Sequence, residues 1–435
     1  MQNRTLIFLA LVVLYSQGLS AYPVDALELT LDQSVEIALQ NNTDLAIVKH
    51  RRSLADLQKS EALGAALPDL DLTARYQYEG NNPEIEFLGQ RFKLVPDNSY
   101  LFNAKLEQYL YSGAIASGYR AARELFSGSE YDVIAMENRV VAEVNALFYR
   151  ALYNRELISI SEESVQQLKV HLKDSKDRES VGLNTSYDTL RFESQLAEAR
   201  SVLVTGKNQY SYSILELLDY MSIDPTTSVQ LKGSFQIKQL NINLSEALVF
   251  AMENRPEIKS AKESSKAAKD MAIAMRSQVF PTVKGFANYN LSNSSGFVES
   301  DELVDSWNAG INIKFNLFDG MERSSRYRKK FVESYIADLE HSRTIRRVRL
   351  EVKAAFDELA RAKELLTSQS KNVEYAEETY RIASVSHREG VATQLKVLDA
   401  HLSLRKAKSN YSKSLYENNV ARVKLLMALG GSYEK

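Results

Sequence analysis

The sequence predicts a mainly α-helical fold with a smaller β part, arranged as two copies of one layout. Only 7 prolines and 17 glycines interrupt 435 residues, which indicates long unbroken elements. Apolar residues recur every three or four positions over long stretches, as in helices, while shorter segments alternate apolar and polar residues, as in strands. Similar segments recur about 210 positions apart, which indicates an internal duplication.

The duplication extends over five collinear pairs of segments. Residues 31–45 (LDQSVEIALQNNTDL) resemble residues 244–258 (LSEALVFAMENRPEI), and Pro68 matches Pro281 at the same offset of 213 positions. Beyond the strands the offset falls to about 208, so we expect the first copy to have the longer loop, between residues 79 and 99.

Each copy is expected to contain a helix, a pair of strands and a long helical hairpin. The first helices, at about 31–66 and 244–279, should be interrupted early by Asn41-Asn42 and Asn254. The expected segments are a first repeat at 22–221 (strand pair 69–111, hairpin 112–221), a linker at 222–243, a second repeat at 244–430 (strand pair 281–318, hairpin 320–430) and a tail at 431–435.

Residues 1–21 have the pattern of a secretory signal peptide. Arg4 is followed by the apolar run LIFLALVVLY and then by the small residue Ala21, after which cleavage is expected. The run is too short to span a membrane, and a buried N-terminal helix is the alternative. We therefore expect the mature chain to begin at Tyr22.

The strands are predicted from strict alternation in two segments. Residues 70–79 (LDLTARYQYE) and 307–317 (WNAGINIKFNL) alternate apolar and polar side chains over about ten residues, the length of a tilted membrane strand. A soluble half-buried sheet would show the same alternation. Aromatic residues near the strand ends suit the two membrane interfaces; they are Tyr76, Tyr78, Tyr100, Tyr109, Tyr111, Tyr289, Trp307 and Phe318.

The hairpins are predicted from long apolar stripes that break at a glycine. No proline occurs from Ser112 to Lys176, and a stripe of this length corresponds to a helix of roughly 100 Å. Breaks at Gly182 and Gly390 are each followed by a shorter returning helix. We therefore expect two antiparallel coiled-coil hairpins with glycine at each turn.

Composition excludes several classes of function. A net charge of −2 leaves no basic surplus for nucleic acid, and the absence of cysteine excludes disulfides, thiolate metal sites and a lipid-anchor cysteine. Enzyme motifs and metal-ligand spacings are absent, so no catalytic residue, cofactor or metal is expected. The five histidines, which are expected on solvated helix faces, are His50, His171, His341, His387 and His401.

Membrane insertion would require strands from several chains. Mean hydropathy is −0.30, and no apolar stretch after the signal reaches the roughly 18 residues of a spanning helix. Four strands cannot close a membrane barrel, which needs eight or more, and open edges are not tolerated in lipid. Geometry alone leaves a dimer with eight strands and a trimer with twelve equally open.

The chain resembles the TolC family of outer membrane efflux proteins over nearly all of its mature length. The most specific segments are VGLNTSYD at 181–188 and EGVATQLKVLDA at 389–400. The resemblance implies a homotrimer in the outer membrane lipid, with one 12-stranded β-barrel, a periplasmic α-helical tunnel and an equatorial region that includes residues 222–243. It implies a passive exit duct of a tripartite efflux pump or type I secretion system, working with a periplasmic adaptor (membrane fusion) protein and, indirectly, an inner-membrane pump or ABC transporter.

The resemblance also implies roles for the hairpin ends. The residues expected to contact the adaptor are Val181, Gly182, Leu183, Ser186, Gly390, Val391 and Thr393; alternatively, the glycines only make the turns. The family pattern places two aspartates at the periplasmic entrance, and the matching positions are Lys396 and Asp399. We expect this mixed pair to reduce cation selectivity, or else to be a solvated surface pair, and we expect Asp188 to brace the closed tip.

Two other classes of protein remain as alternatives. A periplasmic coiled-coil adaptor or structural protein would have one central hairpin, whereas this chain is expected to have two, each preceded by strands. A periplasmic enzyme is disfavoured by the lack of any catalytic motif. Drugs, metal ions and polypeptides are all possible cargo for a duct of this family.

Overall fold

A computed structural model describes residues 27–431 except 82–83, 88, 94–96, 238–239 and 296–297. The expected signal peptide at 1–21 and all of the expected tail except Gly431 lie outside the described residues. The chain divides into two compact units that do not coincide with the two repeats. Unit 1 contains Val140–Leu240, Glu358–Val423 and the chain up to Asn42, and unit 2 contains Thr43–Arg139, Asn241–Asp357 and the chain from Lys424. Each unit thus combines corresponding parts of both copies.

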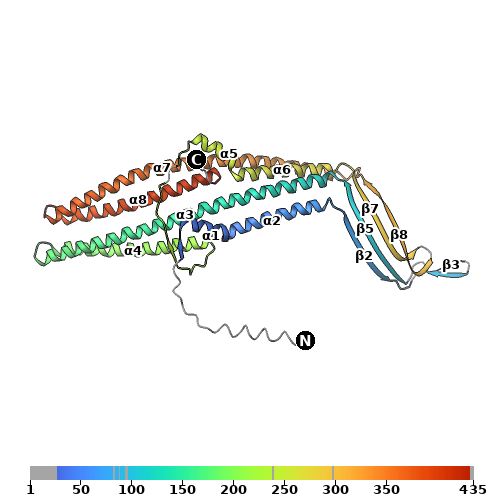
Figure 1. The fold of residues 1–435 in the computed structure, drawn as a ribbon, viewed down its shortest axis with the longest axis horizontal. Coiled ribbons are helices and arrows are strands. Elements are labelled where there is room, and N and C mark those ends of the chain that lie inside the picture. Colours follow the sequence, from blue (N-terminus) through green and yellow to red (C-terminus); the bar gives the residue numbers. More distant parts are fainter. Residues whose placement is uncertain are drawn as a thin grey trace, which may run out of the picture. The chain divides into compact units, whose positions relative to one another are not determined.

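The helices begin and end at local signals that the sequence carries (Figure 1). Thr30 and Gln33 form a reciprocal capping box at the start of α1, and Pro256 occupies the first turn of α6. The helices are α1 (Leu31–Asn41), α2 (Thr43–Gly64), α3 (Gly113–Ser180), α4 (Ser186–Tyr220), α5 (Leu244–Asn254), α6 (Pro256–Ser277), α7 (Glu322–Arg388) and α8 (Gln394–Leu429). The first helix of each copy is therefore two helices. None of the helices within the described ranges combines the length and the apolar character needed to cross a membrane.

Unit 2 contains a four-stranded antiparallel sheet in the order β2-β5-β7-β8. Its strands are β2 (Asp69–Tyr78), β5 (Asn98–Tyr111), β7 (Thr282–Ser295) and β8 (Val298–Lys314), and the longer first-copy loop carries the small hairpin of β3 (Glu84–Phe87) and β4 (Gln90–Lys93). Three of the four strands have 14 to 17 residues and so exceed the expected ten.

The alternation seen at 307–317 overestimates the end of β8, which stops at Lys314. The side chain of Arg323, in the first turn of α7, donates a hydrogen bond to the carbonyl oxygen of Asn316 at 2.6 Å and pairs with Asp319 at 2.6 Å. The ladder itself ends at Lys314 because its partner Thr282 is the first residue of β7, and the preceding Pro281 has no backbone N–H to extend the pairing.

The two faces of the sheet differ in polarity. The strand register aligns Leu72, Ala104, Tyr289 and Trp307 across one face. On the other face the amides of asparagines in adjacent strands are hydrogen-bonded, Asn103 to Asn290 at 2.5 Å and Asn288 to Asn308 at 2.8 Å. The apolar face is exposed, with Leu72 at 78% and Trp307 at 75%, whereas a soluble half-buried sheet would cover it.

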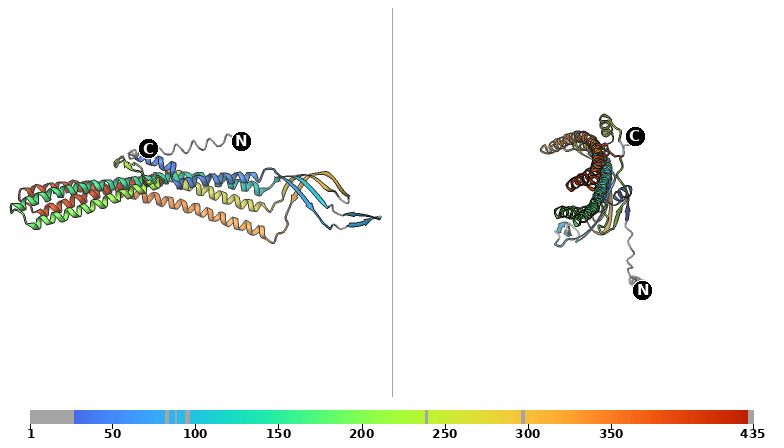
Figure 2. Two further views of the ribbon diagram at one scale, coloured as in Figure 1. Left: turned by 90° about the horizontal axis from the view of Figure 1, so that it is seen from below. Right: turned by 90° about the vertical axis from the view of Figure 1, so that its left-hand side faces the viewer.

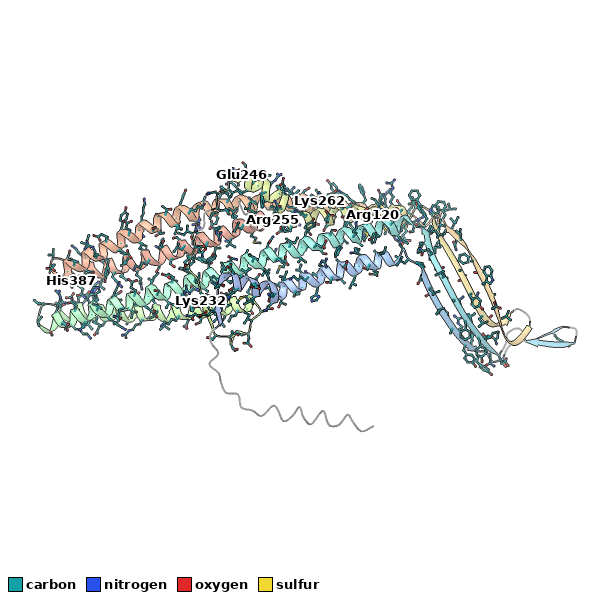
Figure 3. The ribbon with its side chains drawn as sticks, in the orientation of Figure 1. Arg120, Lys232, Glu246, Arg255, Lys262 and His387 are labelled. Atoms are coloured by element: carbon teal, nitrogen blue, oxygen red, sulfur yellow. The ribbon has the colours of Figure 1, made fainter. Side chains whose placement is uncertain are left out.

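Unit 2 also contains a buried cation that closes the end of α8. Arg255, labelled in Figure 3, is 4% exposed and donates hydrogen bonds to the carbonyl oxygens of Met427 and Ala428 at 3.2 and 3.1 Å. Its guanidinium also pairs with Glu257 and Glu351 at 2.9 and 2.7 Å. These carbonyls lie in the last turn of α8, where backbone acceptors have no partner within the helix.

In unit 1, segments of α3, α4, α7 and α8 lie side by side (Figures 1 and 2). Their core includes an apolar cluster from α3, α4 and α8, formed by Val165, Leu168, Phe192, Leu196, Ala199 and Leu398. The linker contributes β6 (Val229–Leu231), which pairs in parallel with β1 (Leu27–Leu29). Arg155 of α3 donates hydrogen bonds to the carbonyl oxygens of Leu231 and Gly233 at 2.7 and 2.6 Å, so the linker is anchored to the long helix.

Candidate functional site

The two hairpins turn through glycines in the left-handed backbone conformation. Gly182 and Gly390 both have φ of 76°, a value that side chains with a Cβ disfavour. After each glycine the backbone N–H bonds back into the helix, from Leu183 to Arg178 at 2.9 Å and from Val391 to Ser386 at 2.8 Å. These six-to-one hydrogen bonds satisfy carbonyls at the helix ends.

The residues expected to contact an adaptor all lie at these two turns. Val181, Leu183 and Val391 are large apolar residues that are 68%, 74% and 82% exposed. Gly182, Ser186, Gly390 and Thr393 are exposed as well. The turns therefore present apolar side chains to solvent on a backbone that glycine allows to bend tightly.

Asp188, which is expected to brace the closed tip, contacts both its own helix start and the second hairpin. Its carboxylate accepts hydrogen bonds from the backbone N–H and hydroxyl of Thr185 at 3.2 and 2.7 Å, within a capping box that starts α4. The link to the second hairpin comes instead from its backbone carbonyl, which accepts a hydrogen bond from the amide of Gln394 at 2.7 Å. The carboxylate is thus engaged locally, and the backbone forms the bridge.

Gln394 is a tip residue that sequence reasoning missed. Its side chain is 7% exposed, and its amide nitrogen joins α8 to α4. No sequence signal identifies it, because its partner is a backbone carbonyl 206 positions away. A second cross-hairpin contact runs from the guanidinium of Arg178 to the carbonyl oxygen of Arg388 at 3.4 Å.

Lys396 and Asp399 are both exposed in the first turns of α8. Three positions apart on a helix, they share one face. Among the residues that the structure describes, no ion pair joins them, so the two charges have no direct contact within the chain.

The histidines do not all lie on solvated faces as expected. His401 of α8 is 2% exposed because it packs against Ser164 of α3 and Tyr380 of α7, and His171 of α3 is half-buried against the same tyrosine. Burial lowers the pKa of His171, and it lowers the pKa of His401 from 6.5 to about 4. Burial also raises the pKa of Tyr380, whose hydroxyl lies 2.8 Å from Nε2 of His171.

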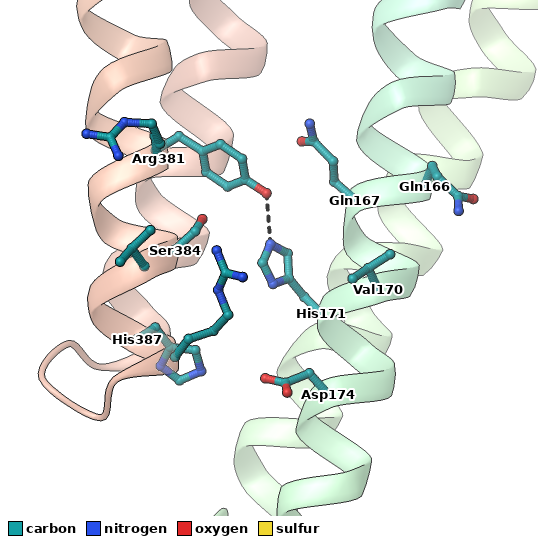
Figure 4. A pocket seen from close by; sticks show the side chains of 11 residues that line it. Gln166, Gln167, Val170, His171, Asp174, Arg381, Ser384 and His387 are labelled. Carbon is teal, nitrogen blue, oxygen red and sulfur yellow. Dashed lines mark hydrogen bonds between the residues drawn. The ribbon is translucent and has the colours of Figure 1, made fainter.

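A cavity of about 540 Å³ lies beside these groups between α3 and α7 (Figure 4). Within the described ranges, no group of three or more histidines, aspartates or glutamates could hold a metal ion. The cavity is lined by Gln166, Gln167, Val170, His171, Asp174, Tyr380, Arg381, Ser384, Val385, His387 and Arg388.

The aromatic residues expected at membrane interfaces are all exposed. Tyr76 and Tyr100 are cross-strand partners with ring centroids 5.3 Å apart, and Tyr289 lies opposite Trp307. Phe318 is exposed too, but it follows the end of β8 and is not part of the sheet. The other members of this set, Tyr78, Tyr109 and Tyr111, lie in β2 and β5.

Comparisons with known proteins agree with this architecture. The family model described as outer membrane efflux protein matches residues 35–221 and 247–431, which include both hairpins and all four strands of the sheet. The chain is 22% identical over 399 residues to outer membrane protein TolC of Vibrio cholerae, covering 90% of this chain and 89% of that protein. It is 18% identical over 410 residues to nodulation protein T of Rhizobium leguminosarum bv. trifolii, covering 93% and 86%.

Among solved structures, the Campylobacter jejuni CmeC outer membrane channel superposes with a TM-score of 0.82 at 19% identity, covering 93% of this chain and 86% of that one. The long helical hairpins and the four antiparallel strands are therefore those of a known channel fold. The family match covers both copies of the duplicated layout, which a one-hairpin adaptor would not provide. The chain belongs to the outer membrane efflux protein family, and it is a transport channel rather than an enzyme.

Proposed function

We propose that three copies of this chain form the exit duct of a tripartite efflux pump or type I secretion system. Their sheets together make one twelve-stranded barrel in the outer membrane, and their hairpins make a helical tunnel in the periplasm. Cargo passes through passively, driven by an inner-membrane pump or ABC transporter that acts through a periplasmic adaptor.

The exposed two-faced sheet carries this proposal. Its apolar face suits lipid, and its asparagine-rich face suits a water-filled lumen. In the described part of the chain, no strand pairs with the outer edge of β2 or of β8. Open edges are not tolerated in lipid, so each β2 is proposed to pair with β8 of a neighbouring copy.

The hairpin turns support the proposed adaptor contact. Val181, Leu183 and Val391 expose apolar surface next to glycine backbone, which permits close approach by another helical hairpin. In a trimer, Lys396 and Asp399 would form adjacent rings at the entrance, where their charges set ion selectivity. The cargo differs among relatives, whose names include pyoverdine export and solvent efflux; we propose that the pump selects it.

Disulfide trapping tests the barrel, because the chain has no native cysteine. Thr73→Cys in β2 is combined in turn with Ser306→Cys, Asn308→Cys or Asn312→Cys in β8, all on the polar face. One combination should give disulfide-linked trimers in the membrane fraction, while each single variant should give no closed trimer. Light scattering of the detergent-extracted protein should independently give the mass of three chains. A monomer released without detergent would disprove the proposal.

Photo-crosslinking tests the adaptor contact. A photoreactive residue at Val391, which is 82% exposed, should crosslink to a membrane fusion protein in intact cells. The matched control is Leu350 of α7, which is 70% exposed but distant in sequence from both turns. Equal crosslinking from both positions, or none from Val391, would contradict a contact at the turns.

A further inference from the structure

The contact between the two hairpins in unit 1 includes two imidazoles and a tyrosine. His171 of α3 and Tyr380 of α7 are joined by a hydrogen bond of 2.8 Å (Figure 4). Tyr380 also lies against His401 of α8, with ring centroids 5.8 Å apart, and its ring is 6.1 Å from that of His171. One tyrosine thus lies between two histidines from different hairpins.

His401 is buried, and only one of its two ring nitrogens has a hydrogen-bond partner among the described residues. It is 2% exposed, and its Nε2 lies 3.4 Å from the hydroxyl of Ser164 of α3. Its buried Nδ1 has no hydrogen-bond partner within the described residues. Charging a buried imidazole without a new partner is costly, since the charged form loses its hydration.

The surrounding charges do not offset a new positive charge. His387 and Arg388 of α7 face His171, and Arg405 faces His401 from α8 itself. The nearby acids are already paired: Asp174 with Arg178 at 3.1 Å, and Glu163 with Lys408 at 2.9 Å. Glu377 of α7, a further acid near this contact, is 3.5 Å from Lys408 and so has a partner too.

We propose that His171, His401 and Tyr380 form an acid-sensitive contact that holds the two hairpins together when the imidazoles are neutral and releases them when they are protonated. Protonation places two cations within about 6 Å of the ring of Tyr380, close to Arg388 and Arg405. A role of this contact in regulating the channel entrance rests on the proposed function. The contact itself lies within one chain and can be tested without the trimer.

The direction of the pH dependence follows from burial. His401 has a pKa of about 4 when packed, against an ordinary value of 6.5, so the packed state binds its proton more weakly. Above pH 6.5 both states are neutral and the contact is fully favourable; as pH falls from 6.5 to 4 the separated state is increasingly favoured. At pH 5, His401 alone should reduce the equilibrium constant for packing about 30-fold.

Electron spin resonance distances between the two turns test this proposal. Val181→Cys and Val391→Cys are both exposed and can carry spin labels in a chain that has no other cysteine. Labelled chains are diluted with unlabelled wild-type chains, so that the measured distances arise within one chain. The labels should move apart between pH 8 and pH 5, with a midpoint between 6.5 and 4.

Replacing the imidazoles should abolish the response. His171→Gln combined with His401→Gln should keep one distance at both pH values, whereas His50→Gln, at an exposed position of α2, should behave as wild type. A constant wild-type distance, or an acid response retained in the double variant, would overturn the proposal. The spin-label distances do not depend on conduction through the channel. A failure of this proposal can therefore be told apart from a failure of the proposed exit duct.

A second variant covers the case in which the double variant does not fold. Tyr380→Phe keeps the ring but removes the hydroxyl that bonds to His171. Loss of the hydroxyl removes one hydrogen bond from the packed state, whichever of the two groups donates it, so the midpoint should move to higher pH. An unchanged midpoint would show that the histidine–tyrosine bond has no part in the transition and would refute its place in the contact.

Discussion

The two hairpin turns share a backbone conformation but differ in how the returning helix begins. Gly182 and Gly390 have the same φ of 76°. In the first turn, Thr185 and Asp188 form a capping box at the start of α4. In the second turn the corresponding positions are Thr393 and Lys396, and a lysine cannot accept the hydrogen bonds that a carboxylate accepts.

The comparison of the two turns distinguishes residues that the turn needs for its structure from residues that it does not need. Both turns need glycine, because the left-handed backbone is required for the chain to reverse. Only the first turn uses its acidic residue locally. Lys396 places a positive charge near the positive end of the α8 dipole, which is unfavourable for the helix. A residue that opposes local stability in this way is a good candidate for a role outside the hairpin.

The largest expected effect on stability comes from replacing the glycine that the two turns share. Gly182→Ala and Gly390→Ala should each destabilise their hairpin end by about 1–2 kcal/mol, because both force a Cβ into the left-handed region. Gly118→Ala is the control, since that helical glycine has open space around it and should gain about 0.5–1 kcal/mol. Hydrogen exchange of the full chain in detergent would measure these changes. If alanine were tolerated at only one of the two turns, the two turns would not share the same requirement for glycine.

The next largest effect on stability comes from replacing the residue that differs between the turns, which is Asp188 in the first and Lys396 in the second. Asp188→Ala should destabilise the start of α4 by about 1 kcal/mol through loss of the capping box. Lys396→Ala should cost nothing and should slightly stabilise the start of α8, since it removes a charge opposed to the dipole. Exchange rates of the amides in the first turn of each helix provide the measurement. Equal losses at both positions would mean that Lys396 has a stabilising contact after all.

The smallest effect on stability is expected from a substitution that gives the second turn the residue pattern of the first. Lys396→Asp restores the Thr-x-x-Asp pattern and should stabilise α8 by about 0.5 kcal/mol. In the proposed trimer it should also shift the reversal potential under a salt gradient toward cation selectivity. Lys406→Asp, an exposed position farther along α8, should give no gain in helix stability. An unchanged reversal potential in Lys396→Asp would remove this residue from the entrance.

Much of the fold could be predicted because its signals are local. Alternation identified β2, proline marked the ends of the first helices, and the duplication placed the corresponding elements in the second copy. The predicted end of β8 was wrong because its partner strand β7 begins at Thr282, opposite Lys314, and the alternation within one segment does not show where a partner ends. The brace expected of Asp188 stays a prediction; the structure adds that its carboxylate caps α4 while its backbone carbonyl links the two hairpins.

The sequence by itself determined the features that depend on neighbours a few positions apart. Glycine at the turns, the Thr185–Asp188 pattern and the period of each helix and strand act through backbone conformation and nearby side chains. Tertiary structure alone decided the strand order β2-β5-β7-β8, the bridge from Gln394 to the carbonyl of Asp188, and the burial of His401. These features join residues about 200 positions apart, and only packing determines which groups lose water and which find partners.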